Sequence, residues 1–101
     1  LVSDDRTELR PGPDGIEACA PAAIRGKIEA RGVGLLAAET APAARIVLAV
    51  DLERTETERL PPPRRLSLLG REVPLLHKVE SAHFAPAILQ YLKSGRIEPT
   101  P

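Results

Sequence analysis

Two aspartates, Asp4 and Asp5, follow directly on the apolar pair Leu1-Val2. The apolar pair is typical of the end of a buried strand, and open α/β sheets bind ligands at the carboxyl ends of their strands. A carboxylate at such a place can hold magnesium, or can accept a proton from a hydroxyl nucleophile. The doublet alone slightly favours the other interpretation, an exposed acidic turn, because aspartate is a common turn residue.

A second candidate lies downstream at Glu29 and Arg31, which are followed by Gly32 and Gly34. Residues two apart project to one face of an extended segment. The glycines let the backbone turn tightly or approach a phosphate closely. The alternative is a surface ion pair, which contributes about 0–1 kcal/mol, beside glycines that only mark a bulge. The residues by themselves leave both interpretations open.

Other reactive side chains have simpler interpretations. His77 and His83 stand six residues apart, and no carboxylate or cysteine completes a known metal-ligand spacing around them. We expect His83 to pack or cap at the start of a helix. Cys19 is interpreted as a small buried apolar side chain. The basic pair Arg64-Arg65 is expected to be solvated, with docking of an acidic partner as the alternative.

The elements that must position these residues are short, because 11 prolines and 7 glycines interrupt the chain. Turn chemistry at 11–15 predicts a hairpin over residues 6–19. In the first half of the chain the pattern further predicts the end of a strand at 1–3, a helical turn at 21–24, a bent strand at 28–36 and a loop at 39–44. The second half is expected to hold a strand covered on both faces at 46–50 and short strands at 66–69 and 72–76. A helix is predicted at 82–93, ended by Gly95, with a frayed tail at 96–101.

Length and composition limit the classes of protein. The 101 residues make one small domain at most, and 14 basic against 14 acidic residues give a net charge of zero. Zero net charge gives no general electrostatic reason to bind nucleic acid or an anionic membrane. The lone Cys19 rules out a disulfide within the chain and fits a reducing compartment. We also expect the abrupt start on Leu1-Val2 to mark the later part of something longer.

Three segments taken in order resemble the catalytic domain of HPr kinase/phosphorylase, in its short proteobacterial form. They are Leu-Val-Ser-Asp-Asp-Arg at 1–6, Ala-Pro-Ala-Ala-Ile at 20–24 and Ile-Glu-Ala-Arg-Gly-Val-Gly at 28–34. The family signature is a Glu-x-Arg-Gly-x-Gly segment downstream of an Asp-Asp pair. The resemblance covers residues 1–93 and is strongest over 1–36. It implies an α/β fold with a P-loop kinase or phosphoenolpyruvate carboxykinase-like core, incomplete here, in a single partial domain 1–101 with short strands and a C-terminal helix.

The resemblance also implies an activity and its residues. The family transfers a phosphoryl group from ATP to a serine of the phosphocarrier HPr with Mg²⁺, and many members also remove it. Carried over from the family to this sequence, Asp5 would accept the proton of the substrate serine and donate it in the reverse reaction. Arg31 and Arg59 would be catalytic, and Glu29 with Asp4 would hold the metal. The expected protein is a cytoplasmic homo-oligomer whose partners are HPr and ATP. The apolar stripe of Leu89, Tyr91 and Leu92 is expected either to contact a second copy or, equally, to belong to the core of its own chain.

This sequence departs from the family at two places. The Gly-rich loop ending in Lys-Ser would lie ahead of Leu1, so we expect no ATP turnover by these residues alone. Residues 74–80 lack the glycine, arginine and asparagine that the family ties to dephosphorylation. The alternatives are a non-catalytic module that binds HPr or regulates, and a small α/β domain whose resemblance is coincidental.

Overall fold

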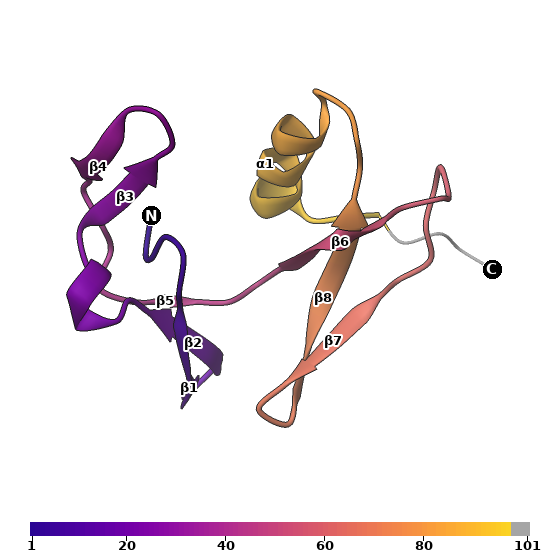
Figure 1. The fold of residues 1–101 in the computed structure, drawn as a ribbon. Helices are drawn as coiled ribbons and strands as arrows, with labels where there is room; N and C mark the ends of the chain where they lie inside the picture. Colours follow the sequence, from indigo (N-terminus) through magenta and orange to yellow (C-terminus); the bar gives the residue numbers. More distant parts are fainter. Residues whose placement is uncertain (98–101) are drawn as a thin grey trace. The chain divides into compact units, whose positions relative to one another are not determined.

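A computed structural model describes residues 1–97, which form a mixed α/β structure with one helix near the C-terminus (Figure 1). Contacts group the chain into two compact units, Leu1–Ile46 and Val47–Pro101, called unit 1 and unit 2. The expectation of a single partial domain stays a prediction, and each unit is described by itself. No helix among the described residues is both long and apolar enough to cross a membrane.

Unit 1 is built on an antiparallel sheet of β1 (Glu8–Gly12), β2 (Gly15–Cys19) and β5 (Ala44–Arg45), with β2 in the middle. The hairpin predicted over 6–19 is confirmed. Its two-residue turn, Pro13-Asp14, forms where proline fixes φ and Gly15 takes a φ of 151°. The predicted helical turn is also confirmed, as the 3₁₀ turn η1 (Ala22–Ile24).

The core of unit 1 lies on one face of β2 and its extension. Ile16, Ala18 and Ala20 are 2%, 8% and 3% exposed, and alternation along an extended chain puts these three on the same side. On the neighbouring positions, the Arg10 guanidinium on β1 donates to the Glu17 carboxylate directly across the ladder. Such directly opposed charges stabilise a strand pair. The sheet is thus held by a narrow apolar stripe and a cross-strand ion pair.

The segment predicted as one bent strand at 28–36 is instead a hairpin. β3 (Lys27–Ala30) pairs antiparallel with β4 (Gly34–Ala37). At the turn, the amide of Val33 donates to the carbonyl of Ala30 at 2.9 Å, and Gly32 takes a φ of 83°. Positive φ at the third position of a four-residue turn is typical of type II and favours glycine. The bend that the glycines indicated is real, and it reverses the chain completely.

Two strand predictions are wrong. Leu1–Ser3 lies in no strand, and Leu1 is 53% exposed, its carbonyl accepting a hydrogen bond from Ala41 at 2.9 Å. The strand expected at 46–50 begins later, as β6 (Ala49–Thr55), and Val47 is 44% exposed. None of residues 46–50 is fully buried, so the expected cover on both faces is not found within the described residues.

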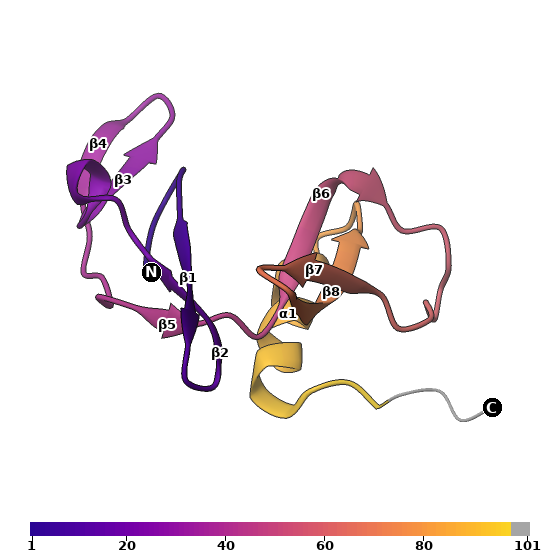
Figure 2. The same ribbon diagram turned by 90° about the horizontal axis from the view of Figure 1, so that it is seen from below.

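Unit 2 contains a sheet in the order β6-β8-β7, visible in Figures 1 and 2. β8 (Arg71–Lys78) runs parallel to β6 and antiparallel to β7 (Arg65–Leu68), and its Val73 is 5% exposed. The two predicted short strands are therefore confirmed. Leu69 and Gly70 make the turn with φ of 50° and 76°, the two positive values that tight hairpins favour.

The predicted helix is confirmed as α1 (Phe84–Ser94), which follows β8 along the chain. It ends where predicted, since Gly95 takes a φ of 72° and its amide donates to Tyr91 at 2.7 Å. Leu76 of β8 lines one hollow with Tyr91 and another with Phe84, which places α1 beside β8. Of the predicted frayed tail, residues 98–101 lie outside the described part of the chain.

Candidate functional site

The acidic doublet forms an exposed bend near the start of unit 1. Asp4 and Asp5 lie between Ser3 and Arg6, and the Ser3 hydroxyl donates to the Arg6 carbonyl across the bend. Hydroxyl-to-backbone bonds of this local kind are how serine holds a turn. The exposed acidic turn that the residues alone favoured is thus the observed local structure, which leaves both carboxylates accessible.

One carboxylate of the doublet reaches the β3–β4 hairpin. The Oδ2 atom of Asp4 accepts a hydrogen bond from the backbone amide of Glu29 at 2.9 Å. This is possible because β3 pairs with β4 on one side only, so that its other edge has free amides. The doublet and the glutamate of the Glu-x-Arg-Gly-x-Gly segment, 25 residues apart in the chain, are therefore neighbours in space.

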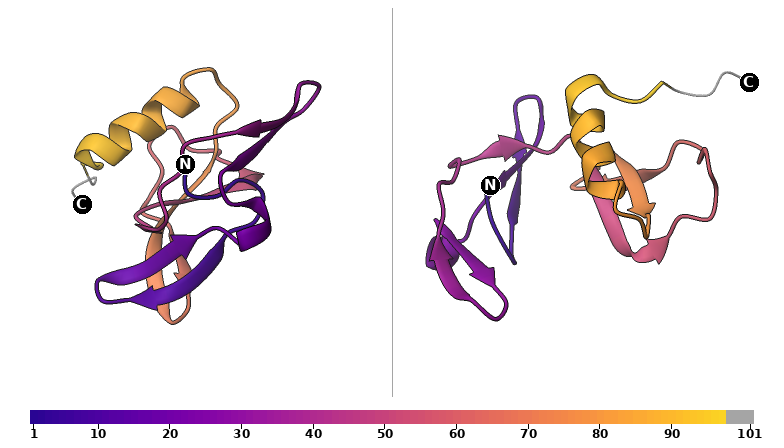
Figure 3. Two further views of the ribbon diagram at one scale, coloured as in Figure 1. Left: turned by 90° about the vertical axis from the view of Figure 1, so that its left-hand side faces the viewer. Right: turned by 90° about the horizontal axis from the view of Figure 1, so that it is seen from above.

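Arg31 lies in the turn of the same hairpin, between Ala30 and Gly32. Figure 3 shows the unit 1 hairpins from two further sides. Because Arg31 is in the turn and Glu29 in the strand, the same-face geometry of an extended segment does not apply. Asp5 and Arg31 are exposed, and within residues 1–97 neither side chain makes a hydrogen bond or ion pair. A carboxylate and a guanidinium without partners are free to meet a ligand or solvent, so their roles stay predictions.

The carboxylates fit one kind of magnesium site and not another. Among the described residues, no group of three or more His, Cys, Asp or Glu side chains could enclose a metal ion. Magnesium, however, is usually held by one or two carboxylates together with water and nucleotide phosphates. Asp4 uses Oδ2 toward Glu29, which leaves its second oxygen available. The donor set therefore suits a metal that arrives with a phosphate ligand.

The remaining candidate, Arg59, belongs to unit 2 and borders the largest hollow described there, about 390 Å³. Within the described residues the exposed Arg59 side chain makes no hydrogen bond or ion pair. The hollow is bounded by the loop after β6, the end of β8 and the start of α1. Its lining consists of Glu56, Glu58, Arg59, Pro61, Leu76, His77, Val79, His83, Phe84 and Ala87.

The lining of this hollow includes Glu56, which is the centre of a charged cluster and is not among the residues that the sequence singles out. Glu56 accepts hydrogen bonds from Nε and Nη2 of Arg64 at 3.0 and 2.9 Å, and from the amides of Thr57 and Glu58. Its side chain is only 6% exposed, and Nδ1 of His77 lies 4.0 Å away. The hydrogen bonds from Arg64 above all lower the pKa of Glu56 from 4.5 to about 2.

The cluster corrects the interpretation of Arg64 as a solvated residue, since Arg64 is half-buried in a two-pronged ion pair. Its neighbour Arg65 is exposed and only 3.9 Å from Glu72. The signal was present in the sequence as a glutamate eight residues before the arginine, with the prolines 61–63 between them. Nothing in the spacing alone shows that the intervening loop folds back so that the two side chains meet.

The expectations for His83 and Cys19 are confirmed only in part. His83 occupies the residue before α1, but its exposed side chain makes no capping hydrogen bond to the helix, and its Nδ1 lies 2.6 Å from the Ser81 hydroxyl. Cys19 is half-buried in β2, with Sγ 3.9 Å from both the carbonyl and a carboxylate oxygen of Glu8. Neither side chain lies in an arrangement that indicates nucleophilic chemistry.

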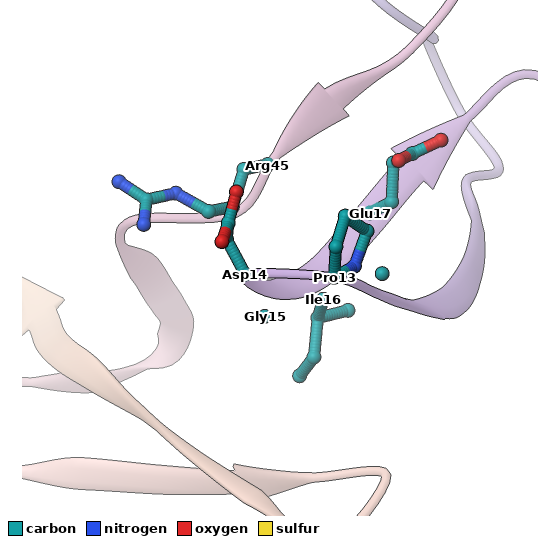
Figure 4. A pocket seen from close by; sticks show the side chains of 7 residues that line it. Pro13, Asp14, Gly15, Ile16, Glu17 and Arg45 are labelled. Carbon is teal, nitrogen blue, oxygen red and sulfur yellow. The ribbon is translucent and has the colours of Figure 1, made fainter.

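A second hollow, in unit 1, is too small for a substrate. It measures about 80 Å³ and lies at the β1–β2 turn, where its lining includes Asp14 of the turn and Arg45 of β5 (Figure 4). At roughly 30 Å³ for each water molecule, it has room for solvent and little else. This hollow carries no functional interpretation.

Comparison with known proteins points to one fold. The sequence matches no protein-family model and no curated protein. Among solved structures, the chain is similar to the HPr(Ser) kinase/phosphatase from Coxiella burnetii, with a TM-score of 0.71 and 20% sequence identity. The match covers 92% of this chain and 65% of that one, so the chain spans about two-thirds of that structure. At this identity the likeness establishes a similar fold.

Proposed function

We propose that this chain is part of a P-loop-type protein kinase that phosphorylates a serine of an HPr-like phosphocarrier, with ATP and Mg²⁺. The observation that carries the proposal is the hydrogen bond from the Glu29 amide to Asp4, which makes neighbours of the two segments that resemble the family signature. The fold similarity to an HPr(Ser) kinase/phosphatase supports it over 92% of the chain.

In this proposal the exposed Asp5 carboxylate accepts the proton of the attacking serine hydroxyl. A hydroxyl is a poor nucleophile until a carboxylate within hydrogen-bond reach takes its proton. Asp4 and Glu29 would hold the magnesium ion, which would supply positive charge to the phosphate oxygens. The resemblance gives Arg31 and Arg59 catalytic roles, and both guanidinium groups lack a protein partner among the described residues.

The proposal extends to assembly and location. As the resemblance implies, we place the protein in the cytoplasm as a homo-oligomer. On α1, Leu89 and Leu92 are 65% and 51% exposed, so they are the apolar side chains of the helix that a second copy would cover. Size-exclusion chromatography of Leu89→Glu tests the contact: a shift to smaller mass supports it, and an unchanged elution contradicts it.

The test of activity is phosphate transfer by the full-length gene product. We expect Asp5→Asn to lower transfer from radiolabelled ATP to an HPr-type carrier by about 10²–10⁴-fold, the usual contribution of a general base. Nucleotide affinity should change little, because asparagine preserves the shape of the residue. Asp14→Asn, in the exposed β1–β2 turn, is the matched control. Near-normal transfer by Asp5→Asn would contradict the role given to Asp5.

A second measurement addresses the metal. We expect Glu29→Gln to raise the Mg²⁺ concentration needed for nucleotide binding, since a carboxylate ligand is replaced by a neutral amide. The Asp4 contact uses the backbone of Glu29, so the substitution leaves it in place. A Mg²⁺ titration identical to that of the unaltered protein would remove Glu29 from the site.

The alternative function is a non-catalytic module that binds or regulates HPr. It is the function expected if the full-length gene product carries no Gly-rich loop ending in Lys-Ser. The upstream coding sequence separates the two: a Gly-x-x-Gly-x-Gly-Lys-Ser segment supports the kinase. Binding of the carrier without any transfer by the full-length product supports the module.

A further inference from the structure

The hollow of unit 2 combines an apolar lining with few polar groups. Leu76, Val79, Phe84, Ala87 and Pro61 supply the apolar part. Its volume of about 390 Å³ lies within the range of roughly 300–1,000 Å³ that small-molecule sites occupy. All of its walls come from unit 2, so the site needs no other part of the chain.

Some charged side chains around the hollow are bound to other protein groups, and one is not. Glu56 is bound by Arg64 through two hydrogen bonds, and the Glu58 carboxylate also attracts Arg64 electrostatically. Arg59 has no hydrogen bond or ion pair within residues 1–97. The guanidinium of Arg59 is therefore available to pair with one negative charge on a ligand. A doubly charged phosphate would meet that single cation with the Glu58 carboxylate beside it, which is unfavourable.

His83 adds an imidazole to the lining. The Ser81 hydroxyl accepts the His83 amide at 3.3 Å and lies 2.6 Å from Nδ1 of the ring. With Nδ1 beside Ser81, Nε2 is the ring nitrogen that remains for a ligand, in addition to the guanidinium of Arg59.

From these features we propose that the hollow binds a small organic monoanion, an aliphatic or aromatic carboxylic acid, with its carboxylate on Arg59 and its apolar body between β8 and α1. The proposal goes beyond the proposed phosphate transfer, because it needs neither nucleotide nor Asp5.

The probe is phenylbutyrate, followed by the amide chemical shifts of the 101-residue chain in heteronuclear NMR. We expect saturable shifts at residues that line the hollow, such as Val79, Phe84 and Ala87. The neutral isostere phenylbutanol should bind about tenfold more weakly, because it loses one charge-assisted hydrogen-bonding group. Shifts spread over unit 1, or no saturable response at the hollow, would overturn the proposal.

Two variants separate the charged and apolar halves of the site. Arg59→Gln should weaken phenylbutyrate about tenfold and abolish its advantage over phenylbutanol. Ala87→Leu should also weaken phenylbutyrate, because leucine fills the hollow from an exposed helix position where it is a good helix former. Unchanged affinity in both variants would overturn the site.

Inorganic phosphate is the last arm of the experiment. A response at the hollow equal to or stronger than that to phenylbutyrate would overturn the preference for an apolar monoanion. A weak response, together with saturable phenylbutyrate binding, supports it. Since no readout uses nucleotide, magnesium or a phosphocarrier, failure here leaves the proposed phosphate transfer standing.

Discussion

The candidate site residues of unit 1 and the Glu56–Arg64 pair of unit 2 are held in opposite ways. In unit 1, Asp5 and Arg31 lie exposed without a protein partner within the described residues, and Asp4 binds only a backbone amide. In unit 2, Glu56 is 6% exposed and accepts four hydrogen bonds, two of them from Arg64. Charges that are bound on all sides stabilise the fold, whereas charges left without partners are available to a ligand.

The difference also bears on where perturbed pKa values should be sought. A shifted pKa in a cleft is often taken as a sign of function. Here the strongly lowered pKa belongs to Glu56, whose cause is a structural ion pair with Arg64. Beside that pair, the partnerless Arg59 is the better candidate for ligand binding. In this chain the absence of a partner is the more useful guide.

The largest effect is expected from the core of unit 1. Ile16→Ala should lower the free energy of unfolding by about 2–3 kcal/mol, since it removes most of a side chain that is 2% exposed. Hydrogen exchange of the β2 and β8 amides measures the change in each unit separately. Leu35→Ala is the matched control, because Leu35 is 67% exposed and its loss should change the free energy by less than about 0.5 kcal/mol.

If β2 amides lose protection while β8 amides keep theirs, the two units unfold separately. Equal loss in both would show that they unfold as one cooperative structure, and the contrast between the units would then not extend to stability. An Ile16→Ala variant as stable as the unaltered protein would contradict the assigned core.

The next effect is a dependence on acid that belongs to unit 2. The pKa of Glu56 is about 2 in the folded state against an ordinary 4.5, so its ion pair stabilises the fold fully above about pH 4.5. That contribution is lost as the pH falls from about 4.5 toward 2, because the unfolded chain takes up the proton first. Urea midpoints followed by the fluorescence of Tyr91 should therefore fall in this window.

Glu56→Gln should remove most of that dependence, since glutamine has no proton to take up. Glu72→Gln is the control, because Glu72 is exposed and lies 3.9 Å from Arg65. A Glu56→Gln variant whose midpoint still falls as steeply as that of the unaltered protein would show that other carboxylates cause the acid sensitivity.

Local signals in the sequence predicted the elements well. Proline and glycine punctuation located the β1–β2 turn and the end of α1 at Gly95, because those residues fix or permit particular backbone angles. The strand predicted at 46–50 with both faces covered begins only at Ala49, and Val47 is 44% exposed. An apolar run does not show which other elements pack against its faces, because that depends on tertiary contacts.

In the candidate site, too, some features could be predicted from the sequence and others depended on tertiary contacts. Asp4 and Glu29 were chosen from residue types and order, and the contact between them joins residues 25 apart in sequence. Glu56 was not singled out, because its importance depends on meeting Arg64 after the 57–63 loop folds back. The types and order of residues indicate which side chains could do chemistry. Whether a charged side chain is paired with another protein group depends on tertiary contacts, which the sequence does not show.

The smallest expected effect concerns the contact that joins the two candidate segments of unit 1. Asp4→Ala removes the acceptor of the Glu29 amide and should cost about 0.5–1.5 kcal/mol, the usual value of one hydrogen bond. The Glu29 amide should then exchange faster with solvent. Asp4→Asn keeps an oxygen acceptor and should restore most of the protection. If Glu29 exchanges equally fast in all three proteins, the bend does not lie against β3, and the acidic doublet and the glutamate do not form one site.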